Sequence, residues 1–170
     1  YTTISKSILK TDIGIFAKKS NHTIIKNSIF NGTDGIDSQD MLNLNITNCT
    51  LYSDYIGINI ERGENISIIN SIIYHSDEYG INIYDSSNVF IGSCIIYEVY
   101  GGLFIEESTH FLVCDNLIYN STYVAIEGYA ISNATFHRNI LTTYIISNGS
   151  EIPIILYTGE NCTFYNNIII

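Results

Sequence analysis

A repeat of about 22 residues constrains this chain more than any other feature. The copies that begin at Gly57 and at Gly80 both open with the sequence Gly-Ile-Asn-Ile. Further copies begin at Gly14, Gly35, Gly102, Ala125 and Pro153. Successive starts lie 21, 22, 23, 22, 23 and 28 residues apart. A fixed period in this range is typical of solenoid proteins, in which each repeat packs against its neighbours.

Each copy contains three short apolar segments with the periodicity of β-strands. In the copy from Gly57, Ile58 and Ile60 share one strand face, and Asn59 between them points outward. A unit of this length cannot bury its own apolar face, so stacking on neighbouring units must bury it. No stretch has helical periodicity long enough to cover a sheet, which favours strands wound directly into a coil. The second and third apolar segments of this copy are residues 66–68 and 72–73.

A small polar residue follows the second strand of every copy. Side chains of this kind can bond neighbouring backbone, and stacked coil on coil they would form a hydrogen-bonded ladder. The residues at this position are Ser28, Cys49, Ser71, Cys94, Asn116, Asn139 and Asn167.

The motifs Gly-Ile-x-Ile, Asn-x-x-Ile and Asn-Ser-Ile or Asn-Asn-Ile resemble the right-handed parallel β-helix repeat of pectate-lyase-like proteins and of the copper-accessory NosD-like family. The resemblance covers nearly the whole chain. It implies an all-β fold, a right-handed parallel β-helix solenoid of about seven coils with three short strands each. It does not define a function, because enzymes and non-enzymes share this scaffold.

We expect one parallel β-helix domain over residues 1–170, excerpted from a longer repeat protein, because no polar cap is visible at either end. The net charge of −10, from 7 basic and 17 acidic residues, disfavours nucleic acid and anionic membranes as partners. No run of residues is long and apolar enough for membrane insertion.

Asn-x-Ser/Thr triplets are dense, which is typical of a glycoprotein and favours an extracellular or cell-surface location. A composition rich in Asn, Ser and Thr also produces such triplets by chance. They begin at Asn21, Asn31, Asn45, Asn48, Asn65, Asn120, Asn133, Asn148 and Asn161.

The cysteines and histidines indicate neither a disulfide framework nor a copper site. Cys49 and Cys94 share a column but lie two coils apart, roughly 9.6 Å, which is beyond disulfide reach. We expect all four cysteines to be small buried residues. The four histidines, His22, His75, His110 and His137, fall in different columns, whereas a copper site needs such ligands gathered in space.

Carboxylates at outward positions are the candidate catalytic residues. In pectate-lyase-like proteins the substrate groove lies along the outward face of the first strand and its flanking loops, so the resemblance places these side chains there. They could bracket a glycosidic bond as acid and base, and carboxylates at coil spacing could bind Ca²⁺. No metal ligand set is defined, so Ca²⁺ is the one cofactor that we consider. The candidates are Asp37, Asp54, Asp77 and Glu127.

Tyrosine recurs at one position in four consecutive coils. Aromatic rings along a groove can stack on sugars, and their hydroxyls can bond sugar hydroxyls. A purely structural aromatic stack is the alternative. With the outward residues of the first strand, the candidate ligand-binding residues are Tyr52, Tyr74, Tyr97, Tyr119, Tyr84, Glu61, Glu106, Asn59 and Asn82.

Three functions remain open from the sequence. The first hypothesis is a non-catalytic binding or adhesion module whose ligand is a polysaccharide or surface glycan. The second is a lyase, epimerase or hydrolase acting on acidic polysaccharide, although its groove would usually be walled by longer loops. The third is a structural spacer without a ligand.

Overall fold

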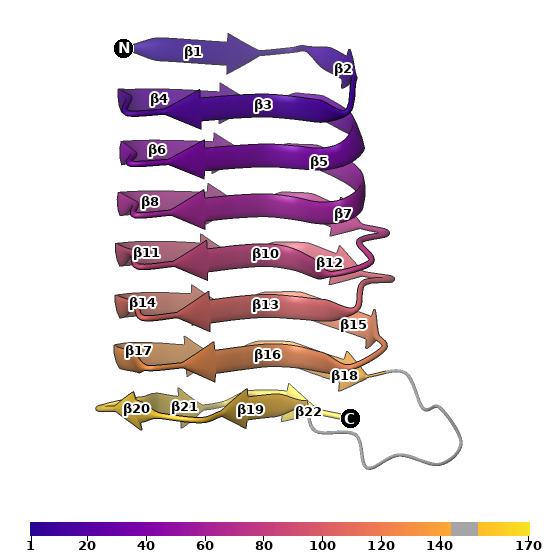
Figure 1. Cartoon of the computed structure of the whole chain (residues 1–170). Coiled ribbons are helices and arrows are strands. Elements are labelled where there is room, and N and C mark those ends of the chain that lie inside the picture. The colour runs from indigo at the N-terminus through magenta and orange to yellow at the C-terminus, as the bar shows by residue number, and fades with distance from the viewer. Residues whose placement is uncertain (144–152) are drawn as a thin grey trace.

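The chain is a solenoid of stacked parallel β-strands (Figure 1). The structure is a computed structural model, and it describes residues 1–143 and 153–170. Every paired strand in the described ranges runs parallel to its neighbours, and these ranges contain no helix. The predicted all-β solenoid fold is therefore confirmed. The triplet at Asn148 lies outside the described residues.

The second strand of each coil forms a nine-stranded sheet. Its register is regular, so that Ile68 pairs with Ile91, and Ile91 with Val113. The strands of this sheet are β1 (Thr2–Ser5), β4 (Asn21–Lys26), β6 (Leu42–Thr47), β8 (Glu64–Ile69), β11 (Ser87–Gly92), β14 (Thr109–Cys114), β17 (Ile131–His137), β20 (Gly159–Glu160) and β21 (Thr163–Tyr165).

The first and third strands of the coils form a 13-stranded sheet. First strands are β3 (Ile13–Lys18), β10 (Tyr79–Tyr84), β13 (Gly101–Glu106), β16 (Val124–Tyr129) and β19 (Ile154–Leu156). Third strands are β2 (Ile8–Lys10), β9 (Ile72–Tyr74), β12 (Ile95–Tyr97), β15 (Leu117–Ser121), β18 (Ile140–Thr143) and β22 (Ile168–Ile169). In the long strands β5 (Ile29–Gln39) and β7 (Thr50–Glu61), the third strand of one coil continues into the first strand of the next.

The core is a set of aliphatic columns inside the coil. Ile58, Ile81 and Leu103 occupy one column and are fully buried. Most coils begin with glycine because there is no room for a side chain at this position. Backbone conformation is not the reason, since no described glycine has a positive φ. A Cβ on Gly57 would lie 2.4 Å from the carbonyl oxygen of Gly80 in the next coil. Neighbouring backbones therefore pack too closely for a side chain at this position.

A hydrogen-bonded ladder forms at the turn between the second and third strands, as predicted, and we call this side of the rod the ladder edge. Asn139 is fully buried, and its Nδ2 donates to the carbonyl of Val113 at 2.9 Å and to Oδ1 of Asn167 at 3.0 Å. Its Oδ1 accepts from the backbone N–H of Asn116 at 3.1 Å and from Nδ2 of Asn116 at 3.0 Å. The preceding Arg138 has a φ of 54°, which makes the turn tight.

The cysteines are free, and Cys49, Cys94 and Cys114 are buried as expected, whereas Cys162 is partly exposed. The expectation for the histidines was wrong for one pair. His22 and His110 lie in a single column four coils apart, because both occupy the second position of their strands.

Candidate functional site

The side of the rod where each third strand leads into the next first strand is its most variable part, and we call it the loop edge. It comprises residues 52–55, 74–79, 97–101 and 119–123. Gly35 follows Ile29 by six positions, whereas Gly80 follows Ile72 by eight. The shorter connection continues as one strand in β5, whereas the longer one between β9 and β10 opens into a loop. The longer connection includes exposed side chains such as those of His75 and Asp77.

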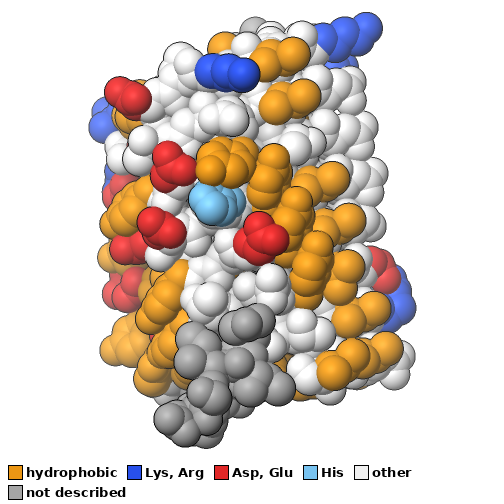
Figure 2. Space-filling model, turned by 90° about the vertical axis from the view of Figure 1, so that its right-hand side faces the viewer, with side chains coloured by type: hydrophobic (Ala, Val, Ile, Leu, Met, Phe, Trp, Pro, Cys, Tyr) orange, Lys and Arg blue, Asp and Glu red, His pale blue; other side chains and the backbone are white. Residues whose placement is uncertain are grey.

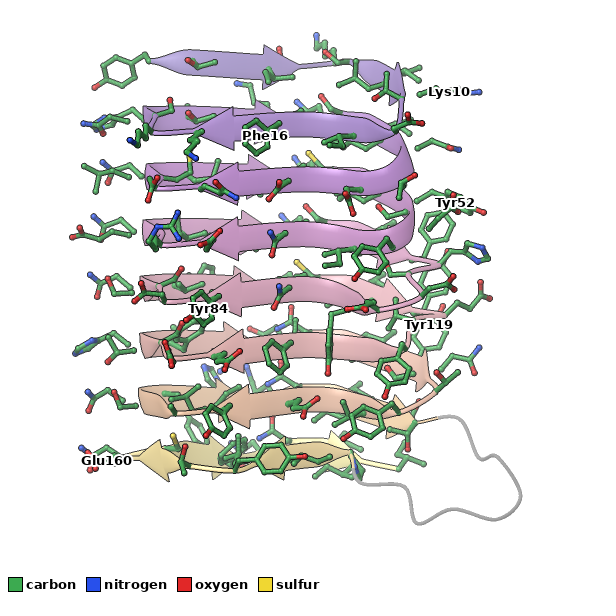
Figure 3. The ribbon with its side chains drawn as sticks, in the orientation of Figure 1. Lys10, Phe16, Tyr52, Tyr84, Tyr119 and Glu160 are labelled. Atoms are coloured by element: carbon green, nitrogen blue, oxygen red, sulfur yellow. The ribbon has the colours of Figure 1, made fainter. Side chains whose placement is uncertain are left out.

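Four stacked side chains, Tyr52, Tyr74, Tyr97 and Tyr119, form what we call the tyrosine row. The rings of Tyr74 and Tyr97 lie 5.1 Å apart and nearly parallel, and those of Tyr97 and Tyr119 repeat this geometry. Tyr52 meets Tyr74 edge-on at 5.4 Å and stacks on His75 at 4.7 Å. Figure 3 shows Tyr52 and Tyr119 on the same side of the rod. The sequence therefore placed these four residues together correctly.

The stacking determines what the tyrosine row can offer a ligand. Parallel neighbours at 5.1 Å cover each other's faces, so the row presents ring edges and hydroxyls rather than open faces for sugar stacking. Partial burial, with a smaller contribution from the neighbouring rings and Glu98, raises the pKa of Tyr97. Its hydroxyl therefore stays protonated and can donate. Ile72 and Ile95, each 37% exposed, extend the apolar surface beside the row.

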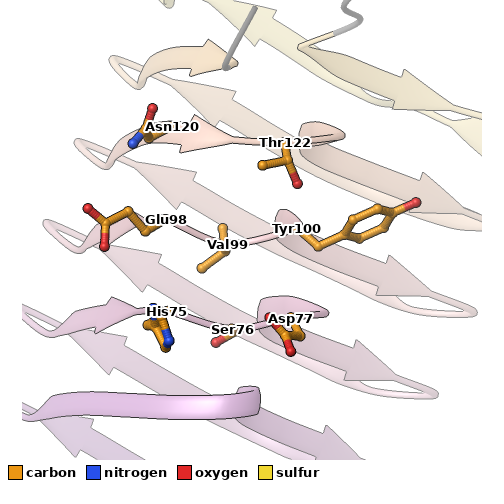
Figure 4. A pocket seen from close by; sticks show the side chains of 8 residues that line it. All are labelled: His75, Ser76, Asp77, Glu98, Val99, Tyr100, Asn120 and Thr122. Carbon is orange, nitrogen blue, oxygen red and sulfur yellow. The ribbon is translucent and has the colours of Figure 1, made fainter. Parts of the chain in front are cut away.

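A shallow depression of about 370 Å³ lies in the loop edge (Figure 4). Three consecutive coils contribute to it, so it runs along the rod rather than around it. Its wall includes the buried Ser76, whose Oγ has no hydrogen-bond partner in the described part of the chain. The lining residues are His75, Ser76, Asp77, Glu98, Val99, Tyr100, Asn120 and Thr122.

Carboxylates gather around this depression. Asp54 and Asp77 are exposed on adjacent coils, and the backbone N–H of Asp77 donates to the carbonyl of Asp54 at 3.1 Å. Glu78 accepts a hydrogen bond that raises the pKa of Tyr55. The face in Figure 2 shows acidic side chains around a histidine, next to a band of hydrophobic side chains. Two of the four predicted catalytic candidates, Asp54 and Asp77, therefore lie at this edge.

Glu127 is the buried partner of a tyrosine. It is 7% exposed, and its Oε2 accepts a hydrogen bond from the Tyr79 hydroxyl two coils away. The ring of Tyr79 passes over Gly101, where a Cβ would lie 2.2 Å from Tyr79 Cε1. Burial, and next the bond to Glu127, raise the pKa of Tyr79 well above its usual range. The sequence prediction missed this pair, although a glycine beside Tyr79 in the register was the available signal.

Asp37 lies far from Glu127. It accepts from Nδ2 of Asn59 at 2.9 Å, and Asn59 in turn accepts from Nδ2 of Asn82 at 2.8 Å. Asp37 and Glu127 share a column but are separated by four coils, or roughly 19 Å at the usual strand spacing. Paired carboxylates of glycosidases lie about 5 to 9.5 Å apart, so these two cannot act on one bond.

The remaining predicted ligand-binding residues lie at the other end of the first strands. Figure 3 shows Tyr84 on the side away from Tyr52 and Tyr119. The Tyr84 hydroxyl donates to Glu107 at 2.9 Å, and Glu61 contacts Arg62. Glu106 pairs in register with Tyr84. The structure thus divides the predicted ligand-binding residues between two distant surfaces and the first-strand face.

Across residues 1–143 and 153–170, no three His, Cys, Asp or Glu side chains are grouped so that they could hold a metal ion. The same residues include no helix with the length and hydropathy needed to cross a membrane.

The comparison with protein families establishes what kind of chain this is. The family model described as right-handed beta helix region matches residues 13–169, and the chain belongs to that family. This confirms the resemblance to right-handed β-helix repeats. No curated protein matches the sequence.

Several solved structures share the fold at low sequence identity. A double mutant of the periplasmic alginate epimerase AlgG matches with a TM-score of 0.84 and 15% identity, covering 99% of this chain and 50% of that chain. DFA-IIIase from Arthrobacter chlorophenolicus A6 matches with a TM-score of 0.63 and 10% identity, covering 88% of this chain and 48% of that chain. The A-module of an Azotobacter vinelandii mannuronan C-5 epimerase matches with a TM-score of 0.51 and 14% identity, covering 98% of this chain and 59% of that chain. The chain thus spans about half the length of these proteins, and the similarity shows the fold alone.

Proposed function

We propose that this chain is a non-catalytic carbohydrate-binding module and that the loop edge is its binding surface. The observation that carries the proposal is the tyrosine row. Tyr74, Tyr97 and Tyr119 repeat one partly exposed position at intervals of 5.1 Å along the rod. A polymer that runs parallel to the rod can meet the same donor and apolar ring edge once per coil.

The chemistry of the loop edge suits a polyhydroxylated ligand. No hydrogen bond to a described residue occupies the hydroxyls of Tyr74, Tyr97 or Tyr119, so they are free to bond sugar hydroxyls. The depression next to the row adds polar groups from Asn120 and Thr122 and an apolar wall from Val99. Binding sites for small ligands combine an apolar lining with a few polar groups in this way. The structural neighbours named for alginate and mannuronan epimerases give independent support for a carbohydrate ligand.

The test is calorimetric titration with a panel of neutral, amino-sugar and uronic-acid hexasaccharides. Tyr97→Ala should weaken binding of the tightest ligand by about 10-fold, because it removes both ring and hydroxyl from the middle of the row. Tyr97→Phe keeps the stack and should cost about 3- to 5-fold, the value of one hydrogen bond.

Tyr84→Phe is the matched control, because it removes one tyrosine hydroxyl at the far end of a first strand. It should leave binding unchanged. Unchanged affinity in Tyr97→Ala would mean that the tyrosine row is only structural and would favour the spacer hypothesis.

A second candidate function is an enzyme acting on glycosidic bonds, and one observation favours it. Asp54 and Asp77 occupy adjacent coils, and strand spacing of about 4.8 Å approaches the separation of paired carboxylates in retaining glycosidases. Release of reducing sugar from the panel, lost in Asp77→Asn, would support a hydrolase. Rising ultraviolet absorbance on uronic-acid polymers with Ca²⁺ would instead indicate a lyase.

An extracellular or cell-surface location and use of the glycosylation triplets remain predictions. The periplasmic location named for the AlgG epimerase supports a setting outside the cytoplasm. Detection of glycans on Asn65 or Asn133, both exposed, in protein purified from its source would test both predictions.

A further inference from the structure

The outward face of the third strands keeps the same chemistry from coil to coil. An aliphatic side chain stands at the first position of most third strands, and the register pairs Ile72 with Ile95 and Ile95 with Leu117. We call this set of side chains the aliphatic column. Its members are Ile8, Ile29, Ile72, Ile95, Leu117, Ile140 and Ile168, with Thr50 taking the place between Ile29 and Ile72.

The aliphatic column is exposed to solvent although its side chains are apolar. Ile72 and Ile95 are each 37% exposed, and Ile140 is 38% exposed. The next residue of the same strands points inward, and Ile73 and Ile96 are fully buried. The column therefore forms an apolar strip along the rod, roughly 34 Å long at the usual strand spacing. A contiguous exposed apolar surface of this kind often marks a binding site.

The two other faces of the rod do not repeat in this way. The preference of β-strands for branched apolar residues applies to all three faces, so it does not explain a column on one of them. Successive outward residues of the first strands are Asp37, Asn59, Asn82, Phe104 and Glu127. Those of the second strands are Ile24, Asn45, Ser67, Phe90, Leu112 and Thr135. A polymer of identical units meets a repeated partner only on the third-strand face.

The aliphatic column and the tyrosine row are neighbours on the same strands. Ile72 and Tyr74 are two residues apart in β9, as are Ile95 and Tyr97 in β12, so all four side chains point outward. Among the described third strands, counting residues 29–31 of β5 and 50–52 of β7, Lys10 is the one charged residue. Figure 3 shows Lys10 at the N-terminal end of the rod. The face thus offers apolar contacts and tyrosine hydroxyls, but almost no charge.

We infer that this face binds uncharged, extended β-1,4-linked glycans, the class to which cellulose and chitin belong. The inference rests on the proposed function and specifies the linkage and the charge of its ligand. A chain of this class is a flat ribbon, because its linkages and ring substituents are equatorial. Each sugar of the ribbon advances by nearly the same distance as one coil of the rod.

The ribbon matches the two columns side by side. The faces of its rings carry C–H groups that can pack on the aliphatic column, whereas its edges carry hydroxyls that can bond to Tyr74, Tyr97 and Tyr119. These tyrosine rings repeat at 5.1 Å, so successive sugars meet successive hydroxyls. An α-1,4-linked glucan is helical and curves away from a straight row. A polyuronate would find no basic partner along the described strip except Lys10.

The experiment compares four hexamers by calorimetric titration: cellohexaose, maltohexaose, chitohexaose and a galacturonate hexamer. Cellohexaose and maltohexaose contain the same sugar and differ only in the configuration of the linkage. Cellohexaose should bind about 10-fold more tightly, which is the value of one or two hydrogen bonds. Chitohexaose should also bind more tightly than maltohexaose, because its ribbon has the same shape. The galacturonate hexamer should bind most weakly of the four.

The variant Ile72→Thr/Ile95→Thr removes apolar surface from the middle of the column and keeps the branched side chains that strands favour. It should weaken binding of cellohexaose by about 10-fold, because less apolar surface is buried under the ribbon. Thermal unfolding checks that the fold is retained. Leu112→Thr is the matched control, because Leu112 is 38% exposed on the second-strand face, and it should leave the affinity unchanged.

Equal or tighter binding of maltohexaose would overturn the inference while leaving the proposed function standing. Tightest binding of the galacturonate hexamer would do the same. Full affinity in Ile72→Thr/Ile95→Thr would mean that the ligand does not lie on the aliphatic column, and this result would also overturn the inference. Absence of binding by all four hexamers would count against the carbohydrate-binding proposal itself.

Discussion

The ladder edge and the loop edge are two turn regions of the same coils, but the ladder edge is nearly the same in each coil whereas the loop edge varies in length and sequence. At the ladder edge each turn from Asn27 to Asn139 uses one left-handed residue followed by a buried small side chain, as in Arg138 and Asn139. At the loop edge the length of the connection varies between six and eight positions, and the side chains that follow the tyrosine row change from coil to coil. A solenoid can thus hold its register with one edge and leave another free to carry a binding surface.

The largest effect should come from breaking the ladder. Asn139→Ala should lower the free energy of unfolding by about 3 kcal/mol, because it leaves the buried backbone N–H of Asn116 without its acceptor and removes the bond to the carbonyl of Val113. Urea denaturation measures the loss. A loss below about 1 kcal/mol would mean that water replaces the amide and that the ladder edge does not hold the register.

An intermediate effect is expected at Tyr79, where the loop edge meets the first strand β10. Tyr79→Phe should cost about 1 to 3 kcal/mol at neutral pH, because Glu127 stays buried without its donor. Thermal unfolding of both proteins provides the comparison.

The same variant gives a pH signature. The folded-state pKa of Tyr79 lies above its unfolded value near 10, so stability is fully present below that pH and is lost as pH rises toward the folded-state pKa. Between pH 10 and 11, wild type should therefore lose stability more steeply than Tyr79→Phe. Parallel curves for the two proteins would show that Tyr79 is solvated and that the contact with Glu127 is not maintained in solution.

The smallest effect is expected at the half-buried amide row of the first strands. Asn59→Ala removes bonds to Asp37 and from Asn82, but water can reach these partners. The loss should stay below about 1 kcal/mol by urea denaturation. A cost equal to that of Asn139→Ala would remove the distinction between a buried ladder that maintains the fold and a surface row that does not.

The sequence predicted those features that depend on repetition. The columns of Ile58 and Ile60, the ladder at Asn139 and the tyrosine row all follow from one residue type recurring at one position. The continuous strands β5 and β7 were not predicted, because connections of the same length are continuous in β7 and interrupted between β12 and β13.

The contents of the candidate site were predicted less well, because they depend on side chains that leave their own coil. The hydrogen bond from Tyr79 to Glu127 spans two coils and needs the empty space above Gly101. The large distance between Asp37 and Glu127 could have been obtained from the sequence by counting the coils between them. The prediction grouped these candidates only because both are acidic. The recurrence of tyrosine predicted that Tyr74 and Tyr97 lie next to each other. That each ring covers a face of the other follows only from the orientation of the ring planes in the structure.

The common register of consecutive coils also has an evolutionary consequence. Equivalent positions such as Ile58 and Ile81 pair with their neighbours in the same register. Recombination between two such repeats in the gene would therefore add or delete one rung and leave a matching surface for every coil that remains. The length of the rod, and with it the length of polymer that the proposed surface could bind, can therefore change by one coil at a time while the core packing stays the same.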